Sequence, residues 1–315
     1  MPASQLLVAA GAGLVGAMLF ASLITGSVAA FILAYLAPLP LFAVGLALGV
    51  GAAAVAAAAG TLAVLAVGGL LLGTLFALLN AVPAAFISRQ ALLNRTTADG
   101  RVEWYPPGRL VLWLAGVATA VFTVLVLATA SLPGGLEGFT REFLMRAFQP
   151  ADETSPNALG LPAESAAQLA ADLARYLPGI VAVSWMVMMA VNGALAEGVL
   201  VRFGLNRRPA PRVADIELPK WLPLGLAIAA AGAFMPGTAG FIGGNLLLIA
   251  LATFTFAGLA VVHTLAESWN NRPLWLLVIY SLTIVFTWPA VLLAVLGIIE
   301  TWLGLRQRLV RPPQT

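Results

Sequence analysis

Long apolar stretches alternate with short polar ones along the whole chain. Residues 4–93 are almost continuously apolar, and later apolar stretches cover 109–131, 176–202, 221–236 and 246–262. A helix needs about 20 mostly apolar residues to cross the hydrocarbon core of a bilayer. We therefore expect one span in each later stretch and four spans in the first, at 4–25, 28–49, 51–69 and 71–93.

The C-terminal stretch, 273–305, is also apolar. One long kinked helix would fit its length, whereas a hairpin turning near Trp288-Pro289 would return Arg306 and the basic end to the side of Arg272. We favour the hairpin. The expected fold is an all-α, polytopic transmembrane helical bundle of nine or ten spans.

The basic residues predict the topology. All but three of the 16 Lys and Arg residues lie in 89–109, in 202–220, at 272 or in 306–311. Basic loops stay on the cytoplasmic side, so we place 94–108, 203–219 and the N-terminus inside. The acidic segment 132–175 is then outside, and the expected location is the bacterial inner membrane.

Segment 132–175 is the one long polar stretch. Leu136, Phe139, Phe143 and Leu144 form an apolar stripe within it, which predicts a short amphipathic helix on the membrane surface; a lid over a substrate entrance is the alternative. Residues 163–176 predict a second, Ala-rich helix before the sixth span. The chain thus divides into an Ala/Gly-rich four-span part (1–93), a cytoplasmic loop with the fifth span (94–131), the extracytoplasmic segment (132–175) and a C-terminal membrane part (176–315).

Composition supports this class, since 61% of the 315 residues are hydrophobic and 9% are charged, against about 25% charged in soluble domains. The chain has no cysteine and one histidine, which excludes disulfides and thiolate metal sites. It contains no phosphate-binding loop and no nucleophile elbow. We expect no cofactor, no enzymatic activity and no nucleic-acid partner.

Prolines and amides interrupt the predicted spans. Pro38 and Pro40 break the second span, either as a kink or as a discontinuous helix at a binding site. Asn192, with Trp185 on the same face, and Asn80 lie within the membrane, where a polar group needs a partner. Each could make an interhelical hydrogen bond or contact a ligand.

The stretch around 246–262 carries the most ordered polar pattern. Asn245 opens it and His263 closes it, five helical turns apart on one face. Glu267 follows one turn later. We expect all three side chains to point into the bundle, with Leu247, Leu251 and Phe254 facing lipid. His263 and Glu267 form either a proton-coupled pair or an interfacial pair.

A stripe of small residues at four-residue spacing marks the first span: Ala9, Gly13, Ala17 and Ala21. Such a stripe allows close approach of another helix. Internal packing and docking of a separate membrane subunit are both open.

The C-terminal third resembles the YybS-like family of uncharacterised polytopic bacterial membrane proteins. The matching features are 218–221 (LPKW) before a span, Asn245 opening the next, Gly258-Leu259 within it, and 296–302 (LGIIETW) in the tail. Ala257 and Glu300 stand where that family often has glutamine and aspartate.

Residues 4–93 are more loosely similar to the start of substrate-binding subunits of energy-coupling-factor importers, in the Ala/Gly-rich first helix and the proline-broken second segment. This likeness implies a coupling subunit as partner. We expect an inner-membrane protein that binds or transports a small neutral or weakly polar solute, and the alternative is a scaffold or assembly factor without a transported ligand. The candidate ligand-binding residues are Asn80, Trp185, Asn192, Asn245, His263 and Glu267.

Overall fold

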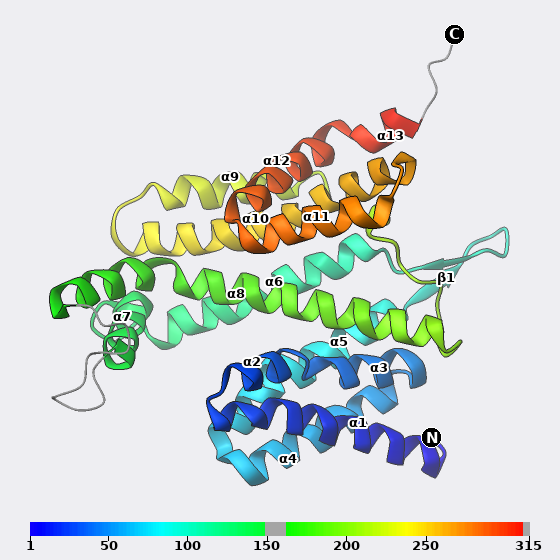
Figure 1. Ribbon diagram of the computed structural model, residues 1–315, viewed down its shortest axis with the longest axis horizontal. Coiled ribbons are helices and arrows are strands. Elements are labelled where there is room, and N and C mark those ends of the chain that lie inside the picture. Colours follow the sequence, from blue (N-terminus) through cyan, green and yellow to red (C-terminus); the bar gives the residue numbers. More distant parts are fainter. Residues whose placement is uncertain (149–161, 311–315) are drawn as a thin grey trace. The chain divides into compact units, whose positions relative to one another are not determined.

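The computed structural model describes residues 1–148 and 162–310 and divides the chain into two compact units (Figure 1). Unit 1 contains Met1–Leu114 and Trp185–Glu217, and unit 2 contains Ala115–Ser184 and Leu218–Thr315. The boundaries fall inside α6 (Pro107–Ala128) and α8 (Ala163–Arg202), so both helices contribute to both units. The part of the predicted extracytoplasmic segment at 149–161 lies outside the described residues, as does the C-terminal 311–315.

Unit 1 is built from helices and one short hairpin. Its elements before α6 are α1 (Ala3–Ala21), the 3-10 turn η1 (Ser22–Thr25), α2 (Val28–Tyr35), α3 (Pro38–Leu48), α4 (Val50–Phe76), the π-helical turn η2 (Ala77–Ala81), α5 (Val82–Ala91), β1 (Asn94–Thr96) and β2 (Val102–Trp104). The two strands are antiparallel, with Arg95 opposite Glu103. After α8 comes the 3-10 turn η3 (Val213–Asp215).

The chain folds back on itself at Gly69 within α4. Gly69 has φ 73° and ψ −176°, a conformation that is almost restricted to glycine. A Cβ on Gly73 would lie 3.0 Å from the Cα of Leu65, and one on Gly60 would lie 2.9 Å from the Phe76 ring. Residues eight apart in a straight helix are about 12 Å apart. The two arms, 50–68 and 70–91, therefore correspond to the expected spans at 51–69 and 71–93.

The small-residue stripe of α1 packs against α4. A Cβ on Gly13 would lie 2.2 Å from the carbonyl oxygen of Ala56, and one on Gly60 would lie 2.7 Å from that of Gly13. Ala9 and Ala17 are buried and Ala21 is half-buried. The contact is internal because only glycine lets these two backbones approach so closely. The structure therefore uses Ala9, Gly13 and Ala17 for internal packing, and docking of a separate subunit on this stripe stays a prediction.

Unit 2 is organised around α10 (Gly237–Leu265). Its other elements are α7 (Gly135–Phe148), α9 (Leu222–Ala233), the 3-10 turn η4 (Ala266–Ser268), α11 (Arg272–Val285), α12 (Thr287–Leu303) and α13 (Leu305–Val310). The glycine-rich sequence 237–244 forms the first turns of α10. Its glycines allow α9 to pack closely, since a Cβ on Gly243 would lie 2.3 Å from the nitrogen of Ala233.

Six described helical stretches are long and apolar enough to cross a membrane, with 28–48 and 50–91 each counted as one stretch, and the bent pair α11–α12 is a seventh if it counts as one span. The expected nine or ten spans are not confirmed. One reason is that α9 has only 12 residues. In the tail, α11 and α12 are bent by 114° at Phe286, two residues before the expected turn at Trp288-Pro289. Whether this tail crosses once or twice stays a prediction.

The predicted surface helices are partly confirmed. α7 buries Leu136 and Leu144, but Phe139 and Phe143 of the same predicted stripe are exposed. Residues 163–176 are not a separate helix, because α8 runs for 40 residues through Pro178. Pro178 interrupts the backbone hydrogen bonds of α8, and the side chain of Asn245 bonds to the backbone on either side of it.

The two basic loops of unit 1 lie on the same side, as expected. Arg208 donates from Nη1 to the carbonyl oxygen of Ala91 over 2.7 Å, and its guanidinium carbon lies 5.9 Å from the centre of the Trp104 ring. A Cβ on Gly108 would lie 1.9 Å from the carbonyl oxygen of Glu217. These contacts join 94–108 to 203–219 at one end of the unit.

Candidate functional site

Asn192, predicted as a ligand contact, binds the backbone at the break between α2 and α3. Its Nδ2 donates to the carbonyl oxygen of Tyr35 over 2.8 Å and to that of Met188 in its own helix over 2.8 Å. In a regular helix the Tyr35 carbonyl would accept from Leu39, but the Leu39 N–H donates to Leu36. Pro38 has no N–H to offer. The side chain of Asn192 therefore supplies the missing donor, and the broken segment is a kink.

Trp185 has the same role at a second proline. Its Nε1 donates to the carbonyl oxygen of Leu79 over 2.7 Å. The residue four positions after Leu79 is Pro83, which cannot make the helical hydrogen bond. The helix widens into the π turn η2 at this point, and Asn80 is buried within that turn. Such a turn accommodates a proline when neighbouring side chains satisfy the freed carbonyls.

Asn245 inserts its amide into α8 beside a third proline, Pro178. Its Oδ1 accepts from the Gly179 N–H over 2.6 Å, and its Nδ2 donates to the carbonyl oxygens of Arg175 over 3.0 Å and Phe241 over 2.8 Å. A regular helix would join Gly179 to Arg175 directly. Asn245 is fully buried, and both of its amide hydrogens are used.

The three side chains share one physical purpose. A carbonyl left without a donor in the membrane interior carries a penalty of several kcal/mol. Asn192, Trp185 and Asn245 each donate to a carbonyl beside a proline of another helix or segment. Their donors are therefore occupied by backbone, and a ligand role for them remains a prediction.

The other end of the predicted 245–267 pattern differs from expectation. His263 is half-buried, and its Nε2 lies 2.9 Å from the hydroxyl of Tyr280 on α11. Glu267 is exposed, so its expected inward orientation is wrong. The reason is that α10 ends at Leu265 and Glu267 lies in the 3-10 turn η4, which changes its direction. Phe254 is buried instead of facing lipid, because α12 packs there: a Cβ on Gly297 would lie 2.0 Å from the Phe254 carbonyl oxygen.

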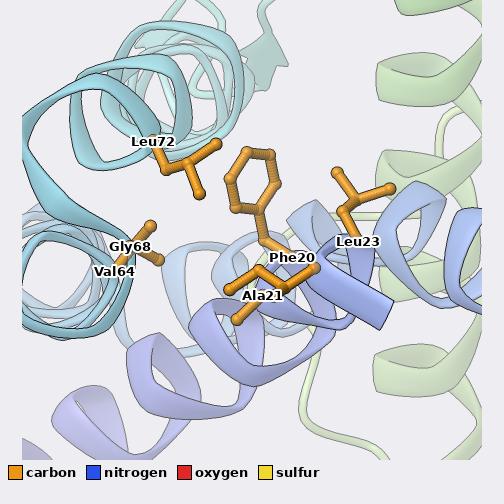
Figure 2. Close-up of a pocket in the computed structure, with 7 residues that line it drawn as sticks. Phe20, Ala21, Leu23, Val64, Gly68 and Leu72 are labelled. Atoms are coloured by element: carbon orange, nitrogen blue, oxygen red, sulfur yellow. The ribbon is translucent and has the colours of Figure 1, made fainter. Parts of the chain in front are cut away.

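The pocket of unit 1 lies elsewhere, between the end of α1 and the fold at Gly69. It has a volume of about 130 Å³, and its lining residues are all apolar: Phe20, Ala21, Leu23, Ile24, Val64, Gly68 and Leu72. Figure 2 shows Phe20, Ala21 and Leu23 on one side and Val64, Gly68 and Leu72 on the other. Ile24 is 60% exposed, so one edge of the pocket lies at the surface of unit 1. None of the predicted ligand residues lines it.

Sequence reasoning missed this pocket because its residues have no polar signature. Its lining residues cannot be distinguished by type from residues that face lipid. The one available signal was the pair Gly68-Gly69, since adjacent glycines predict a tight turn and leave space where side chains would otherwise pack.

A second feature of unit 1 is a group of buried polar atoms near the basic loops. Ser88 Oγ and Glu197 Oε1 have no hydrogen-bond partner, and neither has Asn192 Oδ1. Arg208 is also buried. Burial lowers the pKa of the Arg208 guanidinium, while the negative charge of an ionised Glu197 acts in the opposite direction. Within residues 1–148 and 162–310, no group of three or more metal-binding side chains is assembled.

Comparison with known proteins gives one family. The family model described as "Predicted membrane protein (DUF2232)" matches residues 14–301, which is most of the chain. No curated protein and no solved structure matches the sequence. The family match agrees with the multi-pass membrane character of the helices. It does not test the resemblance to YybS-like proteins or to importer subunits.

Proposed function

We propose, from the premise that the chain belongs to the DUF2232 family of predicted membrane proteins, that it binds a small apolar molecule within the bilayer. The site is the pocket between α1 and α4. The observation that supports this proposal is the fully apolar lining of that pocket. Because Trp185, Asn192 and Asn245 donate to backbone carbonyls, an apolar ligand fits better than the weakly polar one expected from the sequence.

The pocket volume limits what can bind. At about 130 Å³ it approaches the size of an engineered apolar cavity of about 150 Å³ that stays dry and binds benzene. It is well below the roughly 300–1,000 Å³ of pockets that hold whole drug-sized ligands. The ligand is therefore one ring, or the apolar end of a longer amphipathic molecule whose polar end lies at the membrane surface near Gly69.

The test is mass spectrometry of small molecules retained by the purified protein, with a variant that fills the pocket. Ala21→Phe places a ring where the ligand would lie, and Ala120→Phe makes the same change at an exposed position of α6. We expect an apolar molecule to copurify with the wild type and the control but not with Ala21→Phe. Equal retention by all three proteins would contradict the proposal.

A lipid-exchange experiment distinguishes two possible sources of the ligand, a phospholipid acyl chain and a free apolar solute. A phospholipid acyl chain would exchange when the protein is reconstituted in lipids of another chain length, whereas a free apolar solute would stay bound. For either source we propose an inner-membrane protein with a cytoplasmic N-terminus, because the two basic loops contact each other at one end of unit 1. Uptake across the membrane would then require a separate energy-coupling subunit, and the proposal assigns no catalysis to the chain.

The alternative is a membrane scaffold without a transported ligand. The observation that favours it is the engagement of Asn192, Trp185 and Asn245 by backbone, because these side chains rigidify the bundle. Copurification of a stable protein partner together with an empty pocket would favour this alternative over ligand binding.

A further inference from the structure

Glu197 is a buried acid that the proposed apolar site does not use. It lies in α8 five residues before the helix ends at Arg202, and it is 7% exposed. Its Oε1 has no hydrogen-bond donor, and no basic group lies within ion-pair distance among the described residues of unit 1. An ionised carboxylate is strongly disfavoured in this state.

Contacts made by residues before and after Glu197 locate it along α3. α3 runs alongside the end of α8: a Cβ on Gly193 would lie 3.8 Å from the Phe42 ring, and one on Gly49 would lie 2.8 Å from Nη1 of Arg207. Glu197 falls between Gly193 and Arg207 in sequence. It therefore lies at the level between Phe42 and Gly49, where α3 carries Gly45.

Gly45 connects this level to α5. A Cβ on Gly45 would lie 2.7 Å from the Oγ of Ser88, which is fully buried and also without a partner. One turn further along α5, the carbonyl of Ala91 accepts from Arg208. Two unpartnered oxygens and a buried guanidinium thus belong to the part of unit 1 where α3, α5 and α8 meet the loop 203–219.

The charges that face Glu197 can be named for each element. α3 has no titratable side chain. Arg89 of α5 and Arg202 of α8 are exposed, and Arg207 lies against Gly49. Arg208 is the buried basic group of the set, and it interacts electrostatically with Glu197.

A proton is the ligand that suits this arrangement. A metal cation would be repelled by Arg208 and would need several oxygen ligands. The close contact at Gly45 leaves little room for a larger group. A proton requires no additional volume, and it converts an unpartnered buried carboxylate into a neutral acid that can donate a hydrogen bond.

We propose that Glu197 is a proton-binding site of unit 1 and that Arg208 responds to its occupancy. With the proton bound, Arg208 donates to the Ala91 carbonyl, as in the structure. When the proton leaves to water on the side of the basic loops, the carboxylate attracts Arg208 away from Ala91. The loop 203–219 then shifts, and Trp104, which contacts the guanidinium, changes its environment.

The test uses dicyclohexylcarbodiimide, an apolar reagent that modifies buried protonated carboxyls, with peptide mass spectrometry on the full chain. Glu300 is the internal control, because it is equally buried but its Oε1 accepts from Arg306 Nε over 2.8 Å. We expect modification of Glu197 to fall as the pH rises, by about tenfold for each pH unit above its titration midpoint. Glu300 should be modified less than Glu197 under the same conditions, because Arg306 binds its carboxylate.

A second measurement does not depend on entry of the reagent into the protein. Glu197→Gln mimics the protonated acid, so it should leave the melting temperature at neutral pH unchanged and remove the pH dependence of Trp104 fluorescence, with Trp104→Phe as the blank. Glu300→Gln should lower the melting temperature, because it removes the negative charge that faces the buried Arg306. A loss for Glu197→Gln as large as that for Glu300→Gln would overturn the proposal, as would a pH response of Trp104 that Glu197→Gln retains.

Discussion

Replacing Asn245 by leucine should destabilise unit 2 through the backbone of α8. Leucine has nearly the shape of asparagine, so packing is largely kept while all three hydrogen bonds of the amide are lost. Two of these bonds join α10 to α8. Hydrogen bonds between membrane helices contribute about 0.6 kcal/mol on average and up to about 1.7 kcal/mol. The expected loss in unfolding free energy is therefore about 1–3 kcal/mol.

A double-mutant cycle with Pro178 isolates the cause. Pro178→Ala restores an N–H and removes the ring that keeps α8 open, so the Gly179 N–H can bond to the Arg175 carbonyl without help. In that background Asn245→Leu should lose less than about 1 kcal/mol. The assay is reversible unfolding in mixed micelles, with Thr253→Val as control, because the buried Thr253 hydroxyl bonds only within its own helix. Equal losses with and without Pro178 would refute the assignment of Asn245 to the proline break.

Further expected outcomes concern unit 1. Trp185→Phe should lower the unfolding free energy by about 1 kcal/mol more with Pro83 present than in a Pro83→Ala background, measured in the same micelles. Gly13→Ala should lower the melting temperature strongly because its Cβ would lie 2.2 Å from a backbone oxygen of α4, whereas Gly11→Ala, with nothing within 4 Å, should not. Gly69→Ala should reduce stability by about 1–3 kcal/mol through backbone strain alone, and an unchanged melting curve would contradict the fold at Gly69.

The features of the fold that the sequence predicts are those determined by periodicity and hydropathy. Asn245 and His263 share one helix, as five turns of apolar sequence require. The turn near 69–71 and the contact between the basic loops also follow from local signals, namely adjacent glycines and the distribution of arginine. These properties depend on short stretches, so the sequence is sufficient to predict them.

The features that the sequence does not predict are those that depend on tertiary contacts. The sequence marks Pro178 as a helix break and Asn245 as a buried amide, but their partnership joins residues 66 or more positions apart and needs the packing of α10 on α8. Helical periodicity puts Glu267 on the inner face only if α10 continues past Leu265. Phe254 was assigned to lipid because nothing in the sequence locates α12 beside it.

The most direct test of the central claim is photo-crosslinking with an alkyl diazirine followed by peptide mapping. The claim is that an apolar ligand binds between α1 and α4 while the intramembrane amides serve the backbone. The account predicts saturable labelling of Phe20, Leu23, Val64 and Leu72 that an excess of benzene suppresses and that Ala21→Phe abolishes. Saturable labelling around Asn192 or His263 instead, or labelling spread over the exposed faces in proportion to their exposure, would contradict it.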